Sequence, residues 1–137
     1  MKRMICALMI VGLMLLATSA LAATKLTEAT MIYEDYDGNH SDWTITDDGE
    51  LKELTDMLNR AKKHRAELQN CTMNCTLLCK VDGETLVDFA IATDGCPYIT
   101  NQKTGITYRL SDEDQERLWE LFSKIQEDMG YDASLVF

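Results

Sequence analysis

The N-terminal segment constrains this chain most, because it decides where the chain folds and in which redox environment its cysteines react. Lys2 and Arg3 precede an apolar run, Met4–Ala17, and the small residues Ala20 to Ala22 follow. A charged start, an apolar middle and a small-residue cleavage site are typical of a secretory signal peptide. We therefore expect a signal peptide over residues 1–22, export to the periplasm or the extracellular space, and a mature chain, 23–137, that forms a single small domain.

The alternative interpretation of this segment is an uncleaved membrane anchor. Its apolar part approaches the ~20 residues that a helix needs to cross a bilayer. Thr18, Ser19 and the alanines that follow suit a peptidase better than a membrane exit. We therefore favour cleavage, after which we expect no attachment to a membrane.

The mature chain is strongly acidic. The full sequence has 13 basic and 23 acidic residues and a formal charge of −10; loss of Lys2 and Arg3 leaves 11 basic residues and a charge of −12. Such a surface repels the phosphates of nucleic acids and anionic membranes. We expect no nucleic-acid partner. A basic protein partner suits this charge, although solubility alone also explains it.

The segment 71–92 predicts a β-hairpin around Asp82 and Gly83. A type I turn with Gly83 as the bulge residue would place Cys79 opposite Thr85. Because side chains alternate along a strand, this register gathers apolar residues on one face. The expected pairs are Leu77 with Val87, Cys75 with Phe89 and Met73 with Ile91, and the expected apolar face holds Leu77, Cys79, Val87, Phe89 and Ile91.

Four cysteines remain after cleavage, and an even number in an exported chain indicates disulfides. Cys71, Cys75 and Cys79 follow one another at four-residue steps, ~13 Å apart along a strand, whereas a disulfide needs Cα atoms within about 7 Å. Cys96 follows a turn that returns the chain to the start of the Cys71 strand. We predict one disulfide, Cys71–Cys96, with Cys75 and Cys79 as buried thiols. If residues 71–74 were irregular, two bridges would become feasible.

The rest of the pattern predicts an α+β fold. We expect strands at 29–36 and 43–46, a helix over 48–67 whose basic end spans Arg60 to Arg65, and a further hairpin of 97–101 with 106–110. Ser111 should cap a final helix that Gly130 ends. The order β-β-α-β-β-β-β-α indicates an antiparallel sheet with two helices packed on one face, the face that carries Cys75 and Cys79.

Two metal-site patterns were weighed. The segment Asp35–Asp42 resembles a calcium loop, but His40 stands where a glycine is needed and Thr46 replaces the closing glutamate. A hairpin turn explains this segment as well, so we predict no metal there. The cysteines lack a Cys-x-x-Cys pair. The alternative function is nevertheless a metal- or thiol-dependent protein that uses Cys71, Cys75, Cys79 and Cys96.

No catalytic set emerges, since His40 and His64 are the only histidines and neither has a credible nucleophile partner. We predict no enzyme activity and no cofactor; a small hydrolase has no support in the sequence. The leading hypothesis is an exported, acidic, non-enzymatic domain that binds a protein, of the inhibitor, immunity or envelope-accessory type. Its partner would be an unidentified, basic, exported protein, and the candidate contact residues are Tyr33, Asp35, Tyr36, Asp37 and Trp43.

Overall fold

The computed structural model describes residues 24–67 and 70–130; the predicted signal peptide lies outside the described residues. Seven strands form one antiparallel sheet in the order β2-β1-β4-β5-β6-β7-β3. The elements are β1 (Glu28–Glu34), β2 (His40–Ile45), α3 (Asp48–Arg60), β3 (Lys62–Lys63), β4 (Cys75–Val81), β5 (Glu84–Ile91), β6 (Tyr98–Asn101), β7 (Thr107–Arg109), α4 (Asp112–Leu121) and α5 (Ser123–Asp128).

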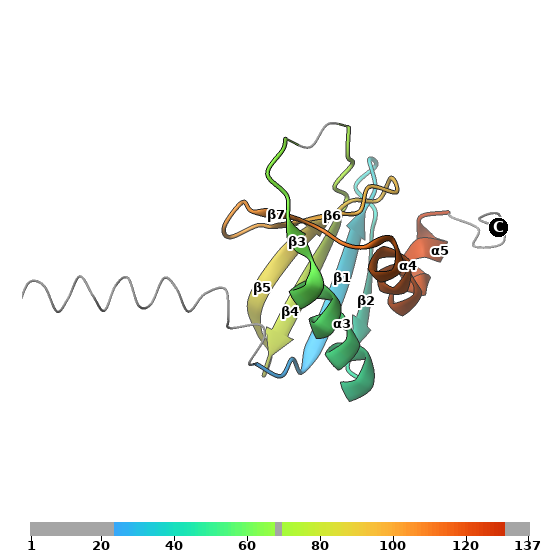
Figure 1. Cartoon of the computed structure of the whole chain (residues 1–137). Coiled ribbons are helices and arrows are strands. Elements are labelled where there is room, and N and C mark those ends of the chain that lie inside the picture. Colours follow the sequence, from blue (N-terminus) through green and yellow to red (C-terminus); the bar gives the residue numbers. More distant parts are fainter. Residues whose placement is uncertain (1–23, 68–69, 131–137) are drawn as a thin grey trace, which may run out of the picture.

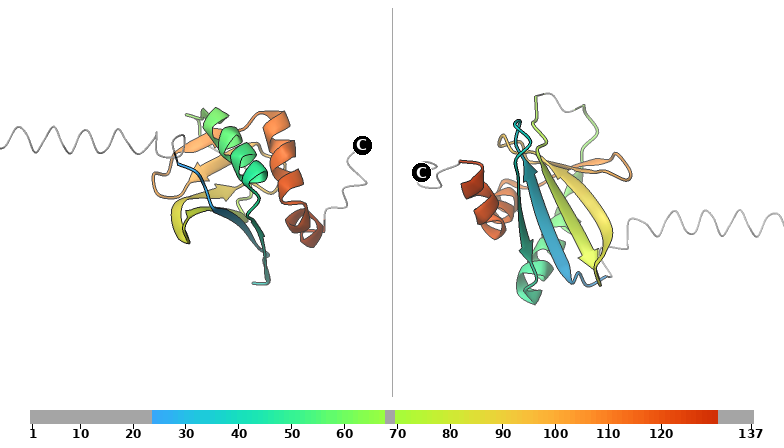
Figure 2. Two further views of the ribbon diagram at one scale, coloured as in Figure 1. Left: turned by 90° about the horizontal axis from the view of Figure 1, so that it is seen from below. Right: turned by 180° about the vertical axis from the view of Figure 1, so that it is seen from behind.

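The helices cover one face of the sheet, as predicted. In Figure 1, α3 and α4 lie in front of the strands, and the view from behind shows β2, β1, β4 and β5 with no helix over them (Figure 2). The core fills the space between the two layers, and its members include the fully buried Met31, Leu54, Leu77 and Phe122. The alternation of buried and half-buried residues along β4 is that of an antiparallel sheet with one face on the core.

The register predicted for the β4–β5 hairpin is wrong by two residues, whereas the predicted apolar face is correct. Asp82 and Gly83 have φ of 50° and 83°, the signature of a two-residue type I′ turn rather than a type I turn with a bulge. A bulge follows at Cys79, which pairs with Val87 instead of Thr85. The tighter turn and the bulge each shift the pairing by one residue. Because the two shifts sum to an even number, every side chain keeps its face.

The predicted helix over 48–67 is too long. It begins as expected, with the Asp47 carboxylate accepting hydrogen bonds from the backbone of Gly49 and Glu50, but it ends at Arg60. Ala61 has an extended ψ of 134°, and Lys62 and Lys63 then form β3, which pairs with β7. The basic segment is therefore divided: Arg60 ends the helix, Lys62 and Lys63 form an edge strand, and Arg65 follows that strand.

The last helix is also interrupted. Ser111 caps α4 as predicted, its hydroxyl accepting a hydrogen bond from the Asp114 backbone at 3.0 Å. Phe122, with φ −113° and ψ 36°, separates α4 from α5. Burial explains the break, since the change of direction lets both Phe122 and Ile125 enter the core. The observed order is therefore β-β-α-β-β-β-β-β-α-α, one strand and one helix more than predicted.

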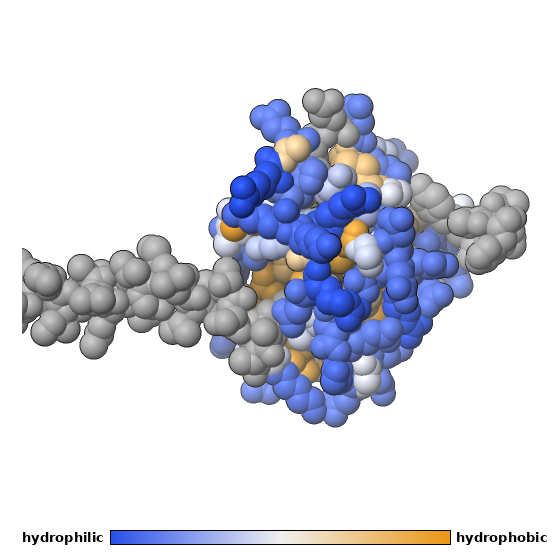
Figure 3. Space-filling model, viewed as in Figure 1, coloured by the Kyte–Doolittle hydropathy of each residue, from blue (hydrophilic) through white to orange (hydrophobic). Residues whose placement is uncertain are grey.

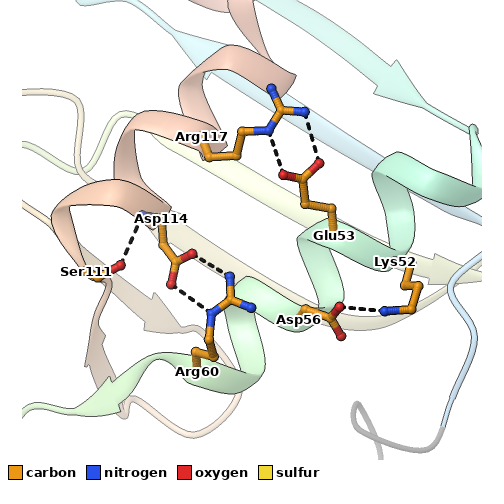
Figure 4. Close-up of polar contacts among 7 residues, drawn as sticks. All are labelled: Lys52, Glu53, Asp56, Arg60, Ser111, Asp114 and Arg117. Atoms are coloured by element: carbon orange, nitrogen blue, oxygen red, sulfur yellow. Dashed lines mark hydrogen bonds and ion pairs between the residues drawn. The ribbon is translucent and has the colours of Figure 1, made fainter.

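Two arginine–carboxylate pairs join α3 to α4 (Figure 4). Arg117 contacts Glu53 with both Nε and Nη2, at 2.6 and 3.0 Å. Arg60 Nη2 lies 2.6 Å from Asp114 Oδ1. The hydrogen bond from Arg60 holds the pKa of Asp114 below its usual range, even though burial acts in the opposite direction.

Candidate functional site

The β1–β2 turn is held by the carboxylate of Asp35. Its Oδ1 accepts hydrogen bonds from the backbone of Asp37 at 2.9 Å and of Asn39 at 2.8 Å, and its Oδ2 accepts one from Asn39 Nδ2 at 3.0 Å. The side-chain hydrogen bond from Asn39 is the main reason why the pKa of Asp35 is lowered. Gly38, at φ 82°, completes the reversal. The segment that resembles a calcium loop is thus a hairpin turn closed by its own side chains.

The turn presents an aromatic ring to solvent. Tyr36 is 88% exposed, more than twice the exposed fraction of Trp43. Beside it lies a hollow of about 280 Å³ at the end of the uncovered sheet face. The residues that line this hollow include two acidic and no basic side chains: Ile32, Glu34, Asp35, Tyr36, Met73, Asn74 and Thr76.

The structure separates the five candidate contact residues into two groups. Asp35, Tyr36 and Asp37 lie together at the turn. Tyr33 and Trp43 belong to the helix side of the same hairpin: Tyr33 packs against the core, and Trp43 pairs with the buried Met31. Trp43 remains 40% exposed, with Lys124 Nζ of α5 5.8 Å from its ring centroid.

Sequence reasoning missed the other wall of the hollow, which Met73 and Asn74 supply. These residues belong to segment 71–74, which was expected to continue a strand but lies before β4 and outside any strand. The backbone carbonyl of Asn74 accepts a hydrogen bond from Glu34 at 3.2 Å, which sets this segment against β1. No local sequence signal marks these residues, because a long-range contact places them.

The first hairpin and the start of α3 concentrate the negative charge of the molecule. Residues 26–51 contain eight acidic side chains and no lysine or arginine. By contrast, Arg60, Lys62, Lys63 and Arg65 gather within one short segment. Lys80 and Lys25 pair with two of the eight acidic residues, Glu28 and Asp48, and the other six leave this part of the molecule with a net negative charge.

The structure contains the predicted disulfide between Cys71 and Cys96, whose Cα atoms are 6.0 Å apart. Residues 71–74 are irregular, which is the arrangement that would allow a second bridge. Cys75 and Cys79 nevertheless remain unbridged and buried, because they lie four residues apart on the core side of β4. The disulfide is reinforced by hydrogen bonds from Thr93 N to Thr72 O at 2.8 Å and from Thr72 N to Asp94 Oδ2 at 2.6 Å.

The cysteines do not form one cluster. Among the described residues, Cys71, Asp94 and Cys96 have potential metal-ligand atoms within 4.8 Å of one another. Cys71 and Cys96 are joined in the disulfide. Burial raises the pKa of both Cys75 and Cys79 to about 12. Since the thiolate is the form that attacks or binds metal, these two side chains are unreactive thiols at neutral pH.

A larger hollow, of about 900 Å³, lies where β7 meets α4, and it combines opposite charges. Arg60 is paired with Asp114, and Arg109 Nη2 lies 4.0 Å from Asp112 Oδ1. His64 is nearby in sequence, but its ring lies against Tyr98, at 4.6 Å between centroids. Four of the charges that line this hollow are therefore paired with one another, Arg60 of α3 and Arg109 of β7 with carboxylates of α4.

Comparisons of the chain with protein-family models, curated proteins and solved structures found no match. Within residues 24–67 and 70–130, no helix has the length and apolar character needed to cross a membrane.

Proposed function

We propose that this protein is an exported, non-enzymatic binding domain that recognises a basic protein through the tip of its β1–β2 hairpin. The exposure of Tyr36 on a turn that Asp35 holds rigid carries this proposal. An aromatic side chain presented by a preorganised turn offers a large contact area at a small entropy cost, and such residues are the common hot spots of interfaces. An inhibitor, an immunity protein or an envelope accessory protein would fit this description.

The electrostatics of the hairpin indicate the chemistry of the partner. Residues 26–51 carry eight acidic side chains and no lysine or arginine, so the tip attracts lysine and arginine and repels acidic surfaces. Complementary charge speeds association and excludes wrong partners more than it raises affinity. We therefore assign specificity for a basic surface to the acidic residues and most of the affinity to Tyr36 and the hollow beside it.

Four of the described carboxyl groups are better suited to structural roles than to proton transfer. General acids and bases work best when their pKa lies near the operating pH, which for a carboxyl means a raised pKa. Glu28, Asp35, Glu53 and Asp114 instead have lowered pKa values, in each case mainly through a hydrogen bond from a neighbouring side chain. These carboxyl groups act as structural anions.

The helix side of the molecule offers less to a partner. The face formed by α3 and α4 is mainly hydrophilic, and apolar residues show there only in small separate patches (Figure 3). Protein-binding surfaces are more often marked by a contiguous apolar patch or by exposed aromatic anchors. This contrast favours the hairpin tip as the contact surface.

The proposal is tested by capturing the partner on the immobilised exported protein and then measuring its dissociation constant with variants. Tyr36→Ala removes the aromatic anchor, and Asp37→Lys reverses a charge beside it. Glu116→Lys is the matched control, because it makes the same charge change on an exposed residue of α4. We expect about tenfold or greater weakening for each tip variant and little change for the control.

Two outcomes would contradict this function. If Tyr36→Ala and Asp37→Lys bind the partner as tightly as the wild type, the hairpin tip is not the contact surface. If Glu116→Lys weakens binding as much as Asp37→Lys does, the acidic surface acts only through its total charge.

A further inference from the structure

The two edges of the sheet are built very differently. One edge is β3, which has two residues, both lysines; short length and lysine are ordinary means of preventing another strand from pairing. The other edge is β2, which has six residues, His40–Ile45, and contains neither lysine nor proline. Its register with β1 is continuous, without a bulge. Among the described residues, the β2 edge therefore lacks these ordinary barriers to pairing with a further strand.

The hydrogen-bond pattern shows which β2 groups are free to accept one. Asp35 N donates to Asn39 O at 2.9 Å on the β2 side, whereas Glu34 N donates to Asn74 O at 3.2 Å on the β4 side. Because the direction alternates along an antiparallel strand, Tyr33 and Met31 bond to β2 through their partners Ser41 and Trp43. The backbone groups of the residues that alternate with these partners, His40, Asp42 and Thr44, then point away from the sheet.

Those three residues are also exposed. The α5 helix contacts β2 from its other side, through a hydrogen bond between Ser41 and Asp128 and through Lys124 over the Trp43 ring. These contacts hold the strand in place. The side chains of His40, Asp42 and Thr44 alternate with those of Ser41 and Trp43 and therefore lie on the uncovered face of the sheet. A preformed strand that exposes a row of donors and acceptors is a template for strand addition.

We propose that the β2 edge binds an extended, basic segment of the partner as an additional β-strand. This inference rests on the proposed function and specifies how the partner is held. Charge selects the occupant, since Asp42 lies on the edge strand itself and residues 26–51 carry eight acidic side chains and no lysine or arginine. A second copy of the chain paired through β2 would bring two such segments together, and their repulsion disfavours it.

The first test uses three synthetic peptides with the wild-type protein. One alternates lysine with threonine over six residues, the second is its analogue with alternate backbone nitrogens methylated, and the third replaces lysine with glutamate. Strand addition predicts saturable binding of the lysine peptide and slower amide exchange at His40, Asp42 and Thr44. It also predicts that the methylated analogue, which keeps the charge but lacks the hydrogen-bond donors, binds at least about tenfold more weakly than the lysine peptide.

The second test separates backbone from charge in the protein itself. Asp42→Pro removes the outward N–H, which makes no bond to β1, and proline is tolerated on edge strands. Asp42→Asn removes the charge and keeps the N–H. We expect Asp42→Pro to weaken lysine-peptide binding at least several-fold more than Asp42→Asn does.

The inference is overturned if the lysine peptide does not bind saturably, or if the methylated analogue binds as tightly as the lysine peptide. Both results are obtained with the wild-type protein, so they do not depend on whether Asp42→Pro folds. It is also overturned if slow exchange at β2 arises without peptide, through a dimer whose population rises with protein concentration. If tip variants weaken partner binding while Asp42→Pro and Asp42→Asn weaken it equally, strand addition is wrong and the proposed function stands. If the tip variants have no effect on the partner, the proposed function itself fails.

Discussion

Removal of the Cys71–Cys96 disulfide should cost this domain a large part of its stability. The bond joins residues 25 apart in sequence, and it restrains the unfolded chain much more than the folded one. The loop-closure relation for a loop of that length gives about 3.5 kcal/mol at 25 °C. For a domain of this size, such a loss corresponds to a fall in Tm of roughly 14 °C.

The assay is urea unfolding of the oxidised wild type and of the Cys71→Ser/Cys96→Ser variant. The native variant should keep the hydrogen bonds that Thr72 makes with Thr93 and Asp94, so the loss arises mainly in the unfolded state. The wild type treated with a thiol reductant is the matched control, because it loses the same bond without a substitution.

A loss of less than about 1 kcal/mol in both proteins would contradict this prediction, since loop closure in the unfolded chain would then contribute little to the free energy of unfolding. A loss in the serine variant alone would assign the effect to the substituted side chains. Equal losses near 3.5 kcal/mol in both proteins would support the chain-entropy account.

Three further predictions concern single sites. The pKa of Asp114 is lowered by the hydrogen bond from Arg60, so its contribution to stability is present above the unfolded pKa of about 3.9 and is lost as pH falls through the lower folded value. Asp114→Asn should therefore lower the free energy of unfolding by about 1 kcal/mol at neutral pH, after allowance for the exposure of Arg60. Urea unfolding should show a progressively smaller loss in acid, and a loss independent of pH would contradict this prediction. Cys75 and Cys79, with pKa values of about 12, should resist alkylation in the native protein at about pH 8 and react in concentrated urea, as followed by intact mass; rapid alkylation of the native protein would show that these thiols are accessible. Gly83→Ala places a side chain at φ 83° and should lower the free energy of unfolding by about 1 kcal/mol, whereas an unchanged midpoint of thermal unfolding would show that the turn relaxes.

The parts of the fold that depend on alternation and local turns could be predicted from the sequence. The residues predicted to face the core in β4 and β5 were correct even though the predicted register was wrong, because the face on which a side chain lies depends only on whether the register shift is even or odd. The disulfide was predictable for a related reason: strand spacing separates neighbouring cysteines too far to bond and leaves Cys71 to pair with Cys96. The cap at Ser111 is likewise a local signal.

The errors occur where tertiary contacts override local preference. The segment after Arg60 is rich in alanine, lysine and arginine, which favour helix, and it contains no glycine or proline to mark the end. Pairing of Lys62 and Lys63 with β7 decides its structure instead. The break at Phe122 has the same origin, since burial of Phe122 and Ile125 outweighs the continuity of one helix.

The candidate site shows the same division. The position of Tyr36 and Asp37 on an exposed turn could be predicted, because a turn rich in acidic residues exposes its side chains. The position of Met73 and Asn74 beside that turn could not, because the disulfide and a hydrogen bond to β1 bring their segment to the hairpin. The place of β2 at the edge could not be predicted either, since it follows from the strand order of the whole sheet.

We propose the first hairpin as the surface that holds a basic partner. Hydrogen–deuterium exchange of the protein, alone and saturated with the captured partner, tests this most directly. We expect slower exchange concentrated in residues 34–44 and little change on α4 and the β3–β7 edge. Slower exchange on α4 or at that edge, with residues 34–44 unchanged, would contradict it.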